Sequence, residues 1–394
     1  MHTFSTFVLA CAQSAPVDTV EYPTCSWVRL QEEPAEDEES PSTWVDPQDG
    51  WFDVSSFLEQ AHGFVPVLAP VTEPALGYGL AGAAVFLDPR EDAGTEGWAR
   101  PNITAVGGMR TENGSDALFA ANSSIWDGGD LHTLVGGGGG GLELELHGIG
   151  GDEALDHDPL DYSLEFKGLV GEGRLRLGDS NLWAGLRFAY AEATVDFEGT
   201  PGDVEGVDPG DDDVTLSGPA LSLRYDSLDN MLSPTAGTLS ESSLSVFDEL
   251  FGGSQDFQLF QQVLIHHWRL SESFFLGARA DLDLSFGDTP FYARPFIALR
   301  GVPALRYQGE HVVSAELELR WRFHPRWSLV GFGGAGMAWT DLEELEREQS
   351  AFTQGLGGRY LVARKFGLLA GLDVARGPEE GAIYVVFGNS WMRP

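Results

Sequence analysis

The chain has almost no lysine and no long apolar run. Only Lys167 and Lys365 occur among its 394 residues, and the formal net charge is −38. Such an excess of carboxylates would repel the phosphates of nucleic acid, which argues strongly against a nucleic-acid partner. The longest nearly apolar stretch, residues 329–339, is far shorter than the ~20 residues that a membrane-spanning helix needs. The sequence therefore predicts no transmembrane helix.

Cysteine is scarce as well. Cys11 and Cys25 both lie near the N-terminus, so they cannot form a disulfide framework for the main body. His266 and His267 are adjacent in a strand-like segment and would face opposite sides, so they predict no metal site. Calcium binding by the acidic segment 203–213 stays open as an alternative to a solvated loop, although the segment lacks EF-hand spacing. The abundant residues are instead 50 glycines and 11% aromatics, a composition that favours β-structure with tight turns and interfacial rings.

The first residues have features of an export signal. Residues 4–12 are apolar, and Ala10-Cys11-Ala12 has the small-x-small pattern of a cleavage site. No Lys or Arg precedes Arg29, so the usual basic region is missing. We expect a signal segment over residues 1–15, with lipidation of Cys11 or an N-terminus without any such role as alternatives.

Residues 16–70 differ in composition from the rest of the chain. They are acidic and rich in proline, which predicts a disordered linker, with one short helix within residues 52–60. The pattern changes after about residue 71 and then stays constant to the end. We therefore expect one large domain over residues 71–394.

Alternation of apolar and polar residues dominates this domain. In residues 315–324 the apolar side chains stand at the odd-numbered positions, and the Glu, Arg and His side chains stand at the even-numbered positions. A period of two predicts a strand, because successive side chains leave opposite faces of a sheet. Residues 278–286, 142–147 and 182–190 repeat the pattern, with Arg187 on the polar face of the last. We expect each segment to present its apolar row to lipid and its polar row to a wet lumen.

The length of these segments favours a membrane barrel over a soluble sandwich. Many of them are much longer than the ~5–6 residues of a typical soluble strand. The fold class predicted is all-β: a transmembrane antiparallel β-barrel preceded by a short disordered acidic segment. About sixteen strands are expected, with fourteen or twelve as alternatives, because bacterial barrels normally have an even number.

One turn resembles a motif of the BamA/TamA-type bacterial surface antigen superfamily. Residues 225–237 (YDSLDNMLSPTAG) are similar to the Asp-x-Arg-Asp-Asn…Pro-x-x-Gly turn of these outer-membrane barrels, although Leu228 replaces the usual Arg. The matching positions are Asp226, Asp229, Asn230, Pro234 and Gly237.

A second segment resembles the long loop that folds back into the barrel in this superfamily. Arg300 and Gly301 match its Arg-Gly-aromatic motif, with Val302 in place of the aromatic residue. The resemblance implies that acidic residues hold Arg300 inside the lumen. Gly334 stands where the superfamily has an Asp partner, which leaves Glu316 and Glu318 as candidate partners; alternatively, Arg300 only fills a polar lumen.

The C-terminal segment, residues 383–391, resembles the signal by which barrel strands are recognised for insertion. Phe387 and Trp391 are its apolar positions. The resemblance also implies a seam between the first and last strands, near residues 78–87 and 383–391. The segment before the barrel is too short and polar for a periplasmic POTRA domain, as in the subgroup that lacks these domains.

The resemblance implies a non-enzymatic protein of the outer membrane of a Gram-negative bacterium that aids insertion or transport of proteins or lipids. The expected partners are outer-membrane lipids, the barrel assembly machinery during insertion, and a protein or lipid substrate; no cofactor is expected, and the oligomeric state stays open. The alternatives are a passive porin-like channel, a lipase or phospholipase with Ser180 of the segment 178–182 as nucleophile, and a soluble secreted β-sandwich.

Overall fold

Sixteen antiparallel strands make up most of the structure, and each pairs with its neighbours in sequence. The structure, a computed structural model, describes residues 44–60, 63–88, 101–147, 159–198, 213–340 and 349–391, which belong to one compact unit, Thr43–Pro394. The expected signal segment and most of the acidic segment 203–213 lie outside the described residues. The predicted fold class and strand number are confirmed. Within the described ranges, no helix has the length and hydropathy to span a bilayer.

The short helix α1 (Ser55–Gln60) precedes the strands, as predicted for residues 52–60. The strands are β1 (Gly63–Val71), β2 (Gly79–Asp88), β3 (Asn102–Thr111), β4 (Asp116–Trp126), β5 (Leu131–Leu146), β6 (Leu160–Arg176), β7 (Leu182–Phe197), β8 (Asp213–Asp226), β9 (Gly237–Phe247), β10 (Phe257–Arg269), β11 (Phe274–Gly287), β12 (His311–Trp321), β13 (Trp327–Trp339), β14 (Gln349–Ala363), β15 (Leu368–Arg376) and β16 (Gly381–Phe387). Three 3-10 turns lie in connections: η1 (Asp127–Gly129), η2 (Glu249–Phe251) and η3 (Phe291–Ala293).

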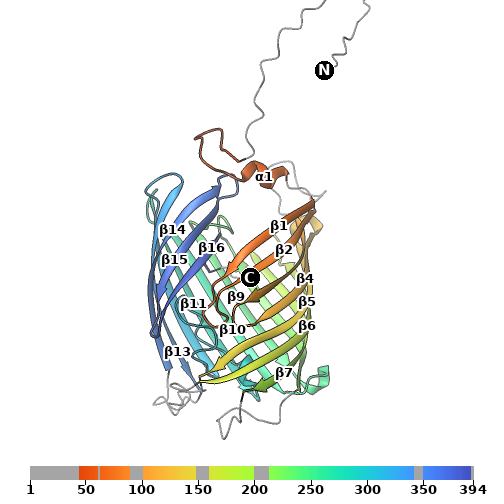
Figure 1. Cartoon of the computed structure of the whole chain (residues 1–394). Coiled ribbons are helices and arrows are strands. Elements are labelled where there is room, and N and C mark those ends of the chain that lie inside the picture. Colours follow the sequence, from red (N-terminus) through yellow and green to blue (C-terminus); the bar gives the residue numbers. More distant parts are fainter. Residues whose placement is uncertain are drawn as a thin grey trace, which may run out of the picture. The chain divides into compact units, whose positions relative to one another are not determined.

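The sheet curls into a nearly closed barrel with a seam between β1 and β16 (Figure 1). No ladder joins these two strands among the described residues. The barrel begins at Gly63, whereas the sequence predicted a linker to residue 70 and a first seam strand near residues 78–87. The reason is Pro66 and Pro70: proline cannot donate to a ladder and argues against a central strand, but an edge strand tolerates it.

The connections alternate between the two ends of the barrel. The end that carries α1 and the connections after even-numbered strands is called the helix end, and the opposite end is called the loop end (Figure 1). The longest connection, residues 288–310, joins β11 and β12 at the loop end. This connection contains Arg300 and returns into the barrel, as described below.

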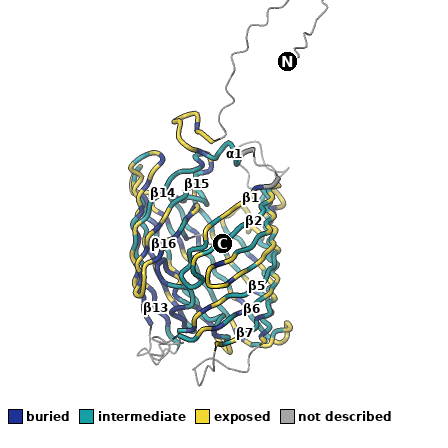
Figure 2. The backbone as a smooth tube through the Cα atoms, in the orientation of Figure 1, coloured by how far each residue is buried: buried dark blue, intermediate teal, exposed yellow. Residues whose placement is uncertain are grey.

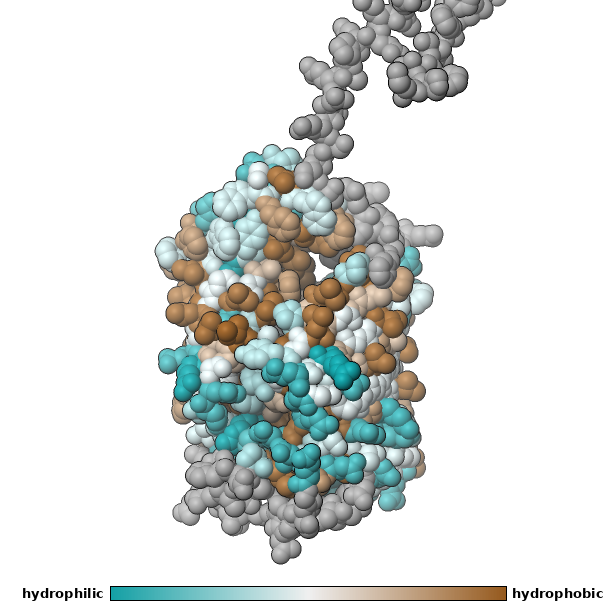
Figure 3. Space-filling model, in the orientation of Figure 1, coloured by the Kyte–Doolittle hydropathy of each residue, from teal (hydrophilic) through white to brown (hydrophobic). Residues whose placement is uncertain are grey.

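Nearer the helix end, the barrel is apolar outside and polar inside. On β12, Leu317, Leu319 and Trp321 are exposed on the outer face, whereas Glu316 is buried. Apolar residues gather on this half of the visible surface in Figure 3, and buried and exposed residues alternate along the strands in Figure 2. The alternation predicted for residues 315–324 is therefore confirmed, although β12 ends at Trp321.

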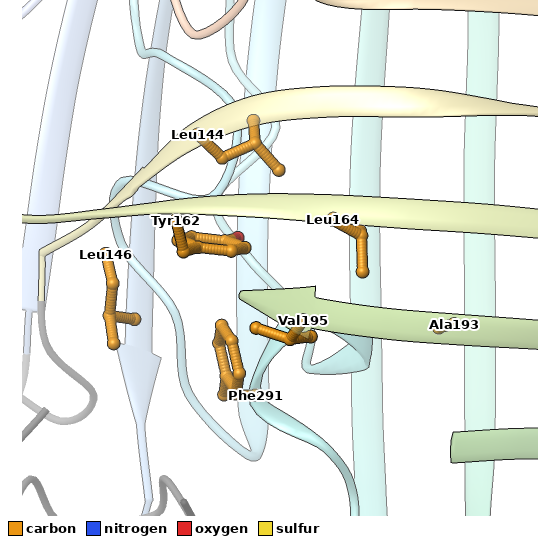
Figure 4. Packing of buried hydrophobic residues seen from close by; sticks show 7 residues of the cluster. All are labelled: Leu144, Leu146, Tyr162, Leu164, Ala193, Val195 and Phe291. Carbon is orange, nitrogen blue, oxygen red and sulfur yellow. The ribbon is translucent and has the colours of Figure 1, made fainter. Parts of the chain in front are cut away.

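Towards the loop end the polarity of β5–β7 reverses. Leu144 and Leu146 are buried in a cluster with Tyr162 of β6, while Glu143 and Glu145 are the alternate residues of β5. The prediction that residues 142–147 present leucines to lipid is therefore wrong. The reason is Phe291, which projects from the loop against this inner wall and creates an apolar core inside the barrel (Figure 4).

The outer face is correspondingly polar at this end. Asp161, Glu165 and Lys167 of β6 are exposed, and Lys167 Nζ lies 2.6 Å from Glu192 of β7. Hydrophilic residues gather towards the loop end of the face shown in Figure 3. A lipid-facing band would not carry such charges, because charged groups are costly there. The apolar band therefore occupies the part of the barrel nearer the helix end.

Residues 44–58, here called the strap, are held against the helix end. The backbone N–H of Val54 donates to the Val362 carbonyl over 2.7 Å, and the Tyr360 hydroxyl donates to the Phe52 carbonyl over 2.7 Å. The N–H of Lys365 donates to Ser55 Oγ over 3.1 Å. The strap contacts β14 and the turn after it, and the chain then continues through α1 into β1, which lies on the other side of the seam.

Three aspartates of the strap surround one arginine. The side chain of Arg326, in the β12–β13 turn, is fully buried and lies 2.5 Å from Asp46, 2.7 Å from Asp49 and 2.5 Å from Asp53. Arg364 adds a contact of 3.1 Å to Asp46. These residues are here called the clasp. They explain why this part of the expected disordered linker is bound to the barrel instead.

The clasp lowers the pKa of two carboxyl groups. A hydrogen bond from Arg326 lowers the pKa of Asp49 from 3.8 to about 2. Burial alone would raise the pKa of Asp53, but hydrogen bonds from Ser55 and Arg326 outweigh it, so the pKa is lowered. A carboxyl group whose pKa is lower in the folded state contributes stability that is complete above its ordinary pKa. That contribution is lost as the pH falls through the folded pKa.

The reversed polarity gives a first prediction. Leu146→Ala should destabilise the barrel by about 2–5 kcal/mol, because it removes a fully buried side chain from the inner apolar cluster. Glu145→Gln, one residue away on the outer face, should change stability by less than about 0.5 kcal/mol. Urea unfolding in detergent micelles, followed by the heat-sensitive gel mobility of the folded barrel, measures both. Equal losses would contradict the inward orientation of Leu146.

The clasp gives a second prediction. Pepsin cleavage within the strap should accelerate as the pH falls from 3.8 to about 2, because protonated Asp49 and Asp53 lose their ionic contacts with Arg326. Cleavage of the denatured chain corrects for the pH dependence of the protease. Arg326→Ala should make the strap sensitive over the whole range. Unchanged protection at the lowest pH would show that the carboxylates do not hold the strap.

Candidate functional site

The β11–β12 loop crosses the lumen. Near its start, Phe291 packs against the inner wall of β5–β7. Further along, Ile297, Leu299 and Val302 are buried in a cluster with Val312 of β12 and residues of β13 and β14. The Gln308 amide donates to the Phe291 carbonyl over 2.7 Å, which joins the two ends of the loop. The loop therefore contacts different walls of the barrel from within.

Arg300, near the middle of this loop, is surrounded by carboxylates. Its Nη2 lies 2.6 Å from Glu316 and 2.9 Å from Glu318, both on β12. Its Nη1 donates to Asp373 on β15 over 2.7 Å. The guanidinium carbon also lies 3.6 Å from the centroid of the Phe332 ring on β13. The structure thus places both predicted candidate partners against Arg300, together with an acidic residue and an aromatic ring that the sequence analysis missed.

Asp373 is the centre of a second ion pair. Its side chain is fully buried and accepts hydrogen bonds from Arg359 on β14, with Nη1 at 2.5 Å and Nη2 at 2.9 Å. Asp373 could have been found from the sequence, because it stands between the apolar Leu372 and Val374, which are exposed on the outer face. Two arginines and three carboxylates, here called the lumen network, thereby connect the loop with β12, β14 and β15.

The position of Gly334 explains why the Asp partner expected there from the resemblance is absent. A Cβ at Gly334 would lie 3.0 Å from the Leu299 side chain, and one at Gly336 would lie 2.5 Å from Ile297. The apolar loop residues therefore occupy the space in front of β13. A carboxylate at residue 334 would compete with Leu299 for this space, and Asp373 reaches Arg300 from another strand instead.

Gly301 allows the loop to approach the β15–β16 hairpin. Its φ of +96° is in the region that favours glycine, and its N–H donates to the Tyr384 hydroxyl of β16 over 2.9 Å. A Cβ at Gly301 would lie 3.1 Å from the backbone nitrogen of Gly377. The Arg-Gly pair thus combines a charge for the lumen network with a backbone that fits against the last strands.

The same loop reaches both sides of the seam. The N–H of Ala304 donates over 3.0 Å to Glu73, in the connection between β1 and β2. Arg306 lies 3.3 Å from Glu379, in the connection between β15 and β16, and the Tyr307 hydroxyl donates to the same carboxylate. The loop therefore contacts the first and the last hairpin at the loop end.

The C-terminal residues enter the lumen instead of extending β16. Trp391 is buried beside Leu239 and Ile265, and its ring lies 5.4 Å from that of His267. Its indole N–H donates over 2.5 Å to the Glu316 oxygen that also accepts from Arg300. Ser390 donates to Glu318 over 2.9 Å. The tail thus joins the lumen network.

This placement corrects the interpretation of the C-terminal pattern. Phe387, the last residue of β16, is exposed on the outer face. Trp391 was expected on the same apolar row, but the chain turns at Gly388, whose φ is +74°, and the indole points inward. Only Phe387 keeps the predicted position on the strand.

The turn that resembles the superfamily motif is stabilised by its own polar side chains. Asp229 accepts from the N–H groups of Thr235 and Ala236, and Asn230 accepts from those of Leu232 and Ser233. The Asn230 amide donates to the Phe366 carbonyl over 3.1 Å, which connects the β8–β9 and β14–β15 turns.

The remaining motif positions complete this turn. Asp226 lies 2.8 Å from Arg224, and the Pro234 carbonyl accepts from Arg320 over 3.2 Å. Gly237 has a φ of +109° at the start of β9. Leu228, which replaces an arginine of the motif, packs against the cluster that contains Trp391.

A cavity of about 540 Å³, lined by both charged and apolar side chains, lies in the lumen at the helix end of β5–β8. Arg174 of β6 lies 2.8 Å from Glu241, and Arg224 of β8 lies 3.1 Å from the same carboxylate. Trp183 and Met231 also line the cavity. Among the described residues, the loop and the tail thus fill much of the lumen, and this cavity remains beside β5–β8.

Ser180 and the adjacent histidines have local explanations. The Ser180 hydroxyl donates to the Leu177 carbonyl over 2.7 Å and accepts from the Leu182 N–H over 3.1 Å, as in a simple turn. His266 lies 2.7 Å from the Thr238 hydroxyl, whereas His267 is buried beside Trp391. Within the described residues, no cluster of three or more His, Cys, Asp or Glu side chains has a metal-binding arrangement.

Comparison with solved structures finds barrels with a similar fold. Neither a protein-family model nor a curated protein sequence matches the chain. The crystal structure of BamA from Haemophilus ducreyi lacking POTRA domains 1–3 is similar, with a TM-score of 0.58 and 13% identity over 83% of this chain and 70% of that chain. The fold is that of the BamA barrel. The predicted resemblance is thus confirmed at the level of the fold.

CdiB barrels share the same architecture. CdiB from Acinetobacter baumannii has a TM-score of 0.54 and 10% identity over 82% of this chain and 59% of that chain. CdiB from Escherichia coli has a TM-score of 0.55 and 10% identity over 84% and 60%. The chain therefore spans about three fifths of the length of these CdiB proteins.

The lumen network gives a third prediction. Arg300→Ala should destabilise the barrel by about 3–5 kcal/mol, because it leaves Glu316 and Glu318 inside the lumen without their cation. Arg376→Ala, an exposed arginine at the end of β15, should cost less than about 0.5 kcal/mol. Urea unfolding in micelles measures both. A loss in Arg300→Ala no larger than that in Arg376→Ala would show that the network does not brace the barrel.

Proposed function

We propose that the protein is a non-enzymatic outer-membrane barrel of a Gram-negative bacterium that aids the insertion or transport of proteins or lipids. The observation that carries this proposal is the loop held across the lumen by Arg300 in a barrel whose first and last strands share no ladder in the described part of the chain. The likeness to BamA and CdiB barrels supports it. The apolar outer band supports a membrane location, with the helix end facing the periplasm and the longer loops outside.

The occupied lumen disfavours a passive porin. In a porin the lumen is a water-filled channel. Here apolar loop residues such as Ile297 and Leu299 fill the part of the lumen beside β12–β14. Trp391 fills another part of the lumen from the helix end. A substrate would instead meet the cavity at the helix end or the unpaired edges of β1 and β16. Outer-membrane lipids would surround the apolar band, and the barrel assembly machinery would insert the chain.

The fourth prediction tests the assisting role directly. Vesicles that contain the full-length protein should accelerate the folding of a second, urea-unfolded outer-membrane barrel relative to empty vesicles, because the unpaired edges offer a template for new strands. Folding of the second barrel is followed by its heat-sensitive gel mobility. Vesicles with Arg300→Ala should accelerate it less, and vesicles with Arg376→Ala as much as the original protein.

Conductance separates the assisting role from the porin alternative. In planar bilayers the original protein should conduct poorly, and removal of residues 288–310 should open a large conductance. A large steady conductance of the original protein, without any acceleration of folding, would contradict the proposal and favour the porin.

A further inference from the structure

Exposed aromatic side chains gather on the outer face near the helix end. Each of the following residues lies at or next to the end of its strand on this side and is at least two-fifths exposed: Trp126, Tyr225, Trp268, Phe274, Trp321 and Trp327. Rings at this position are typical of the aromatic girdle where a membrane barrel crosses the boundary between hydrocarbon and water. We call these residues the girdle.

The strap continues the girdle with aromatic residues from outside the barrel. Trp44, Trp51 and Phe52 are 47%, 42% and 51% exposed. The ring of Trp51 lies 6.4 Å from that of Tyr360, which itself lies 4.8 Å from Trp327 of the girdle. Trp44 stacks on Phe52 at 6.3 Å. The exposed rings of the strap are thus continuous with those of β13 and β14.

Two of the three aspartates of the strap have the opposite exposure, and the third, Asp49, is exposed but pairs with Arg326. Asp46 and Asp53 are buried against Arg326 in the clasp, so their charges are neutralised within the protein. The strap therefore combines a buried ionic side with an exposed aromatic side. Large apolar rings are unfavourable in water. Tryptophan rings are favourable at the level of lipid headgroups.

We propose that the strap is an interfacial anchor whose aromatic side chains, Trp44, Trp51 and Phe52, insert among the phospholipid headgroups at the helix end of the barrel. The clasp holds the strap at the level of the lipid headgroups, and the lipid covers the aromatic side of the strap. This inference rests on the membrane location in the proposed function, and it adds a lipid-binding surface outside the barrel wall.

The test places one fluorescent probe at a time on the full chain in phosphatidylcholine vesicles. Cys11 and Cys25 are replaced by serine, and a bimane probe is attached to Phe52→Cys in the strap, Leu356→Cys on the outer face of β14, or Leu250→Cys in η2 at the loop end. Leu356 and Leu250 are 72% and 82% exposed. Quenching is measured with doxyl-labelled phospholipids and with aqueous iodide.

The three positions give distinct expected results. Doxyl lipids should quench the probes at residues 52 and 356, with the shallow doxyl position more effective at residue 52, and iodide should quench only the probe at residue 250. Quenching of residue 52 by iodide, or by neither agent, while lipids quench residue 356, would overturn the anchor and leave the membrane barrel intact. If doxyl lipids did not quench the probe at residue 356, the membrane location itself would be wrong, and the anchor with it.

Discussion

The guanidinium of Arg300 is buried, so it requires carboxylates around it. This requirement constrains both the loop that carries Arg300 and the strands that face it. The loop must enter the lumen to bring Arg300 to β12 and β15, and these strands must carry Glu316, Glu318 and Asp373 at one level. A buried ion pair is not by itself a large source of stability, since the desolvation of both partners opposes it. Its main effect is specificity, because any other position of the loop would leave the charges unpaired.

The loop also accounts for the reversed polarity along β5–β7. A barrel lumen without a plug would contain water, and leucines would be unfavourable there. Phe291 covers Leu144, Tyr162 and their neighbours, so this part of the barrel resembles a soluble protein, with its core inside and its charges outside. The same strands can therefore face lipid near the helix end and water near the loop end without a break in their alternation.

The sequence predicts the barrel, but it does not predict for every strand which row of side chains faces outward. Alternation predicts which residues share a face, and the apolar face of residues 315–324 does lie outside. For residues 142–147 the period is equally clear, but a period of two cannot say which face is the outer one; that depends on Phe291, which is distant in sequence. Alternation likewise marks Asp373 as an inward polar residue between Leu372 and Val374, but it cannot identify its partner Arg300, which comes from a loop on another part of the chain.

Two departures from the family pattern are explained by a contact between them. Leu228 stands where an arginine was expected, and Trp391 leaves the apolar row of the last strand; the structure brings the two into one cluster. An arginine at residue 228 would place a charge next to a buried indole. The inward tail and the apolar turn residue are therefore consistent with each other, although neither sequence feature predicts the contact on its own.

The distribution of contacts around the seam suggests how its edges are held without a ladder. At the loop end, the loop joins Glu73 beside β1 to Glu379 beside β16. At the helix end, Asp53 binds the N–H of Arg364 after β14, and the strap then leads into β1. The connection at the helix end also includes Asp46 and Asp49 of the clasp and hydrogen bonds to the backbone of Val362 and Lys365. Opening of the seam would therefore require the loss of these ionic contacts and hydrogen bonds at its two ends, whereas opening between any other pair of strands would break a complete ladder.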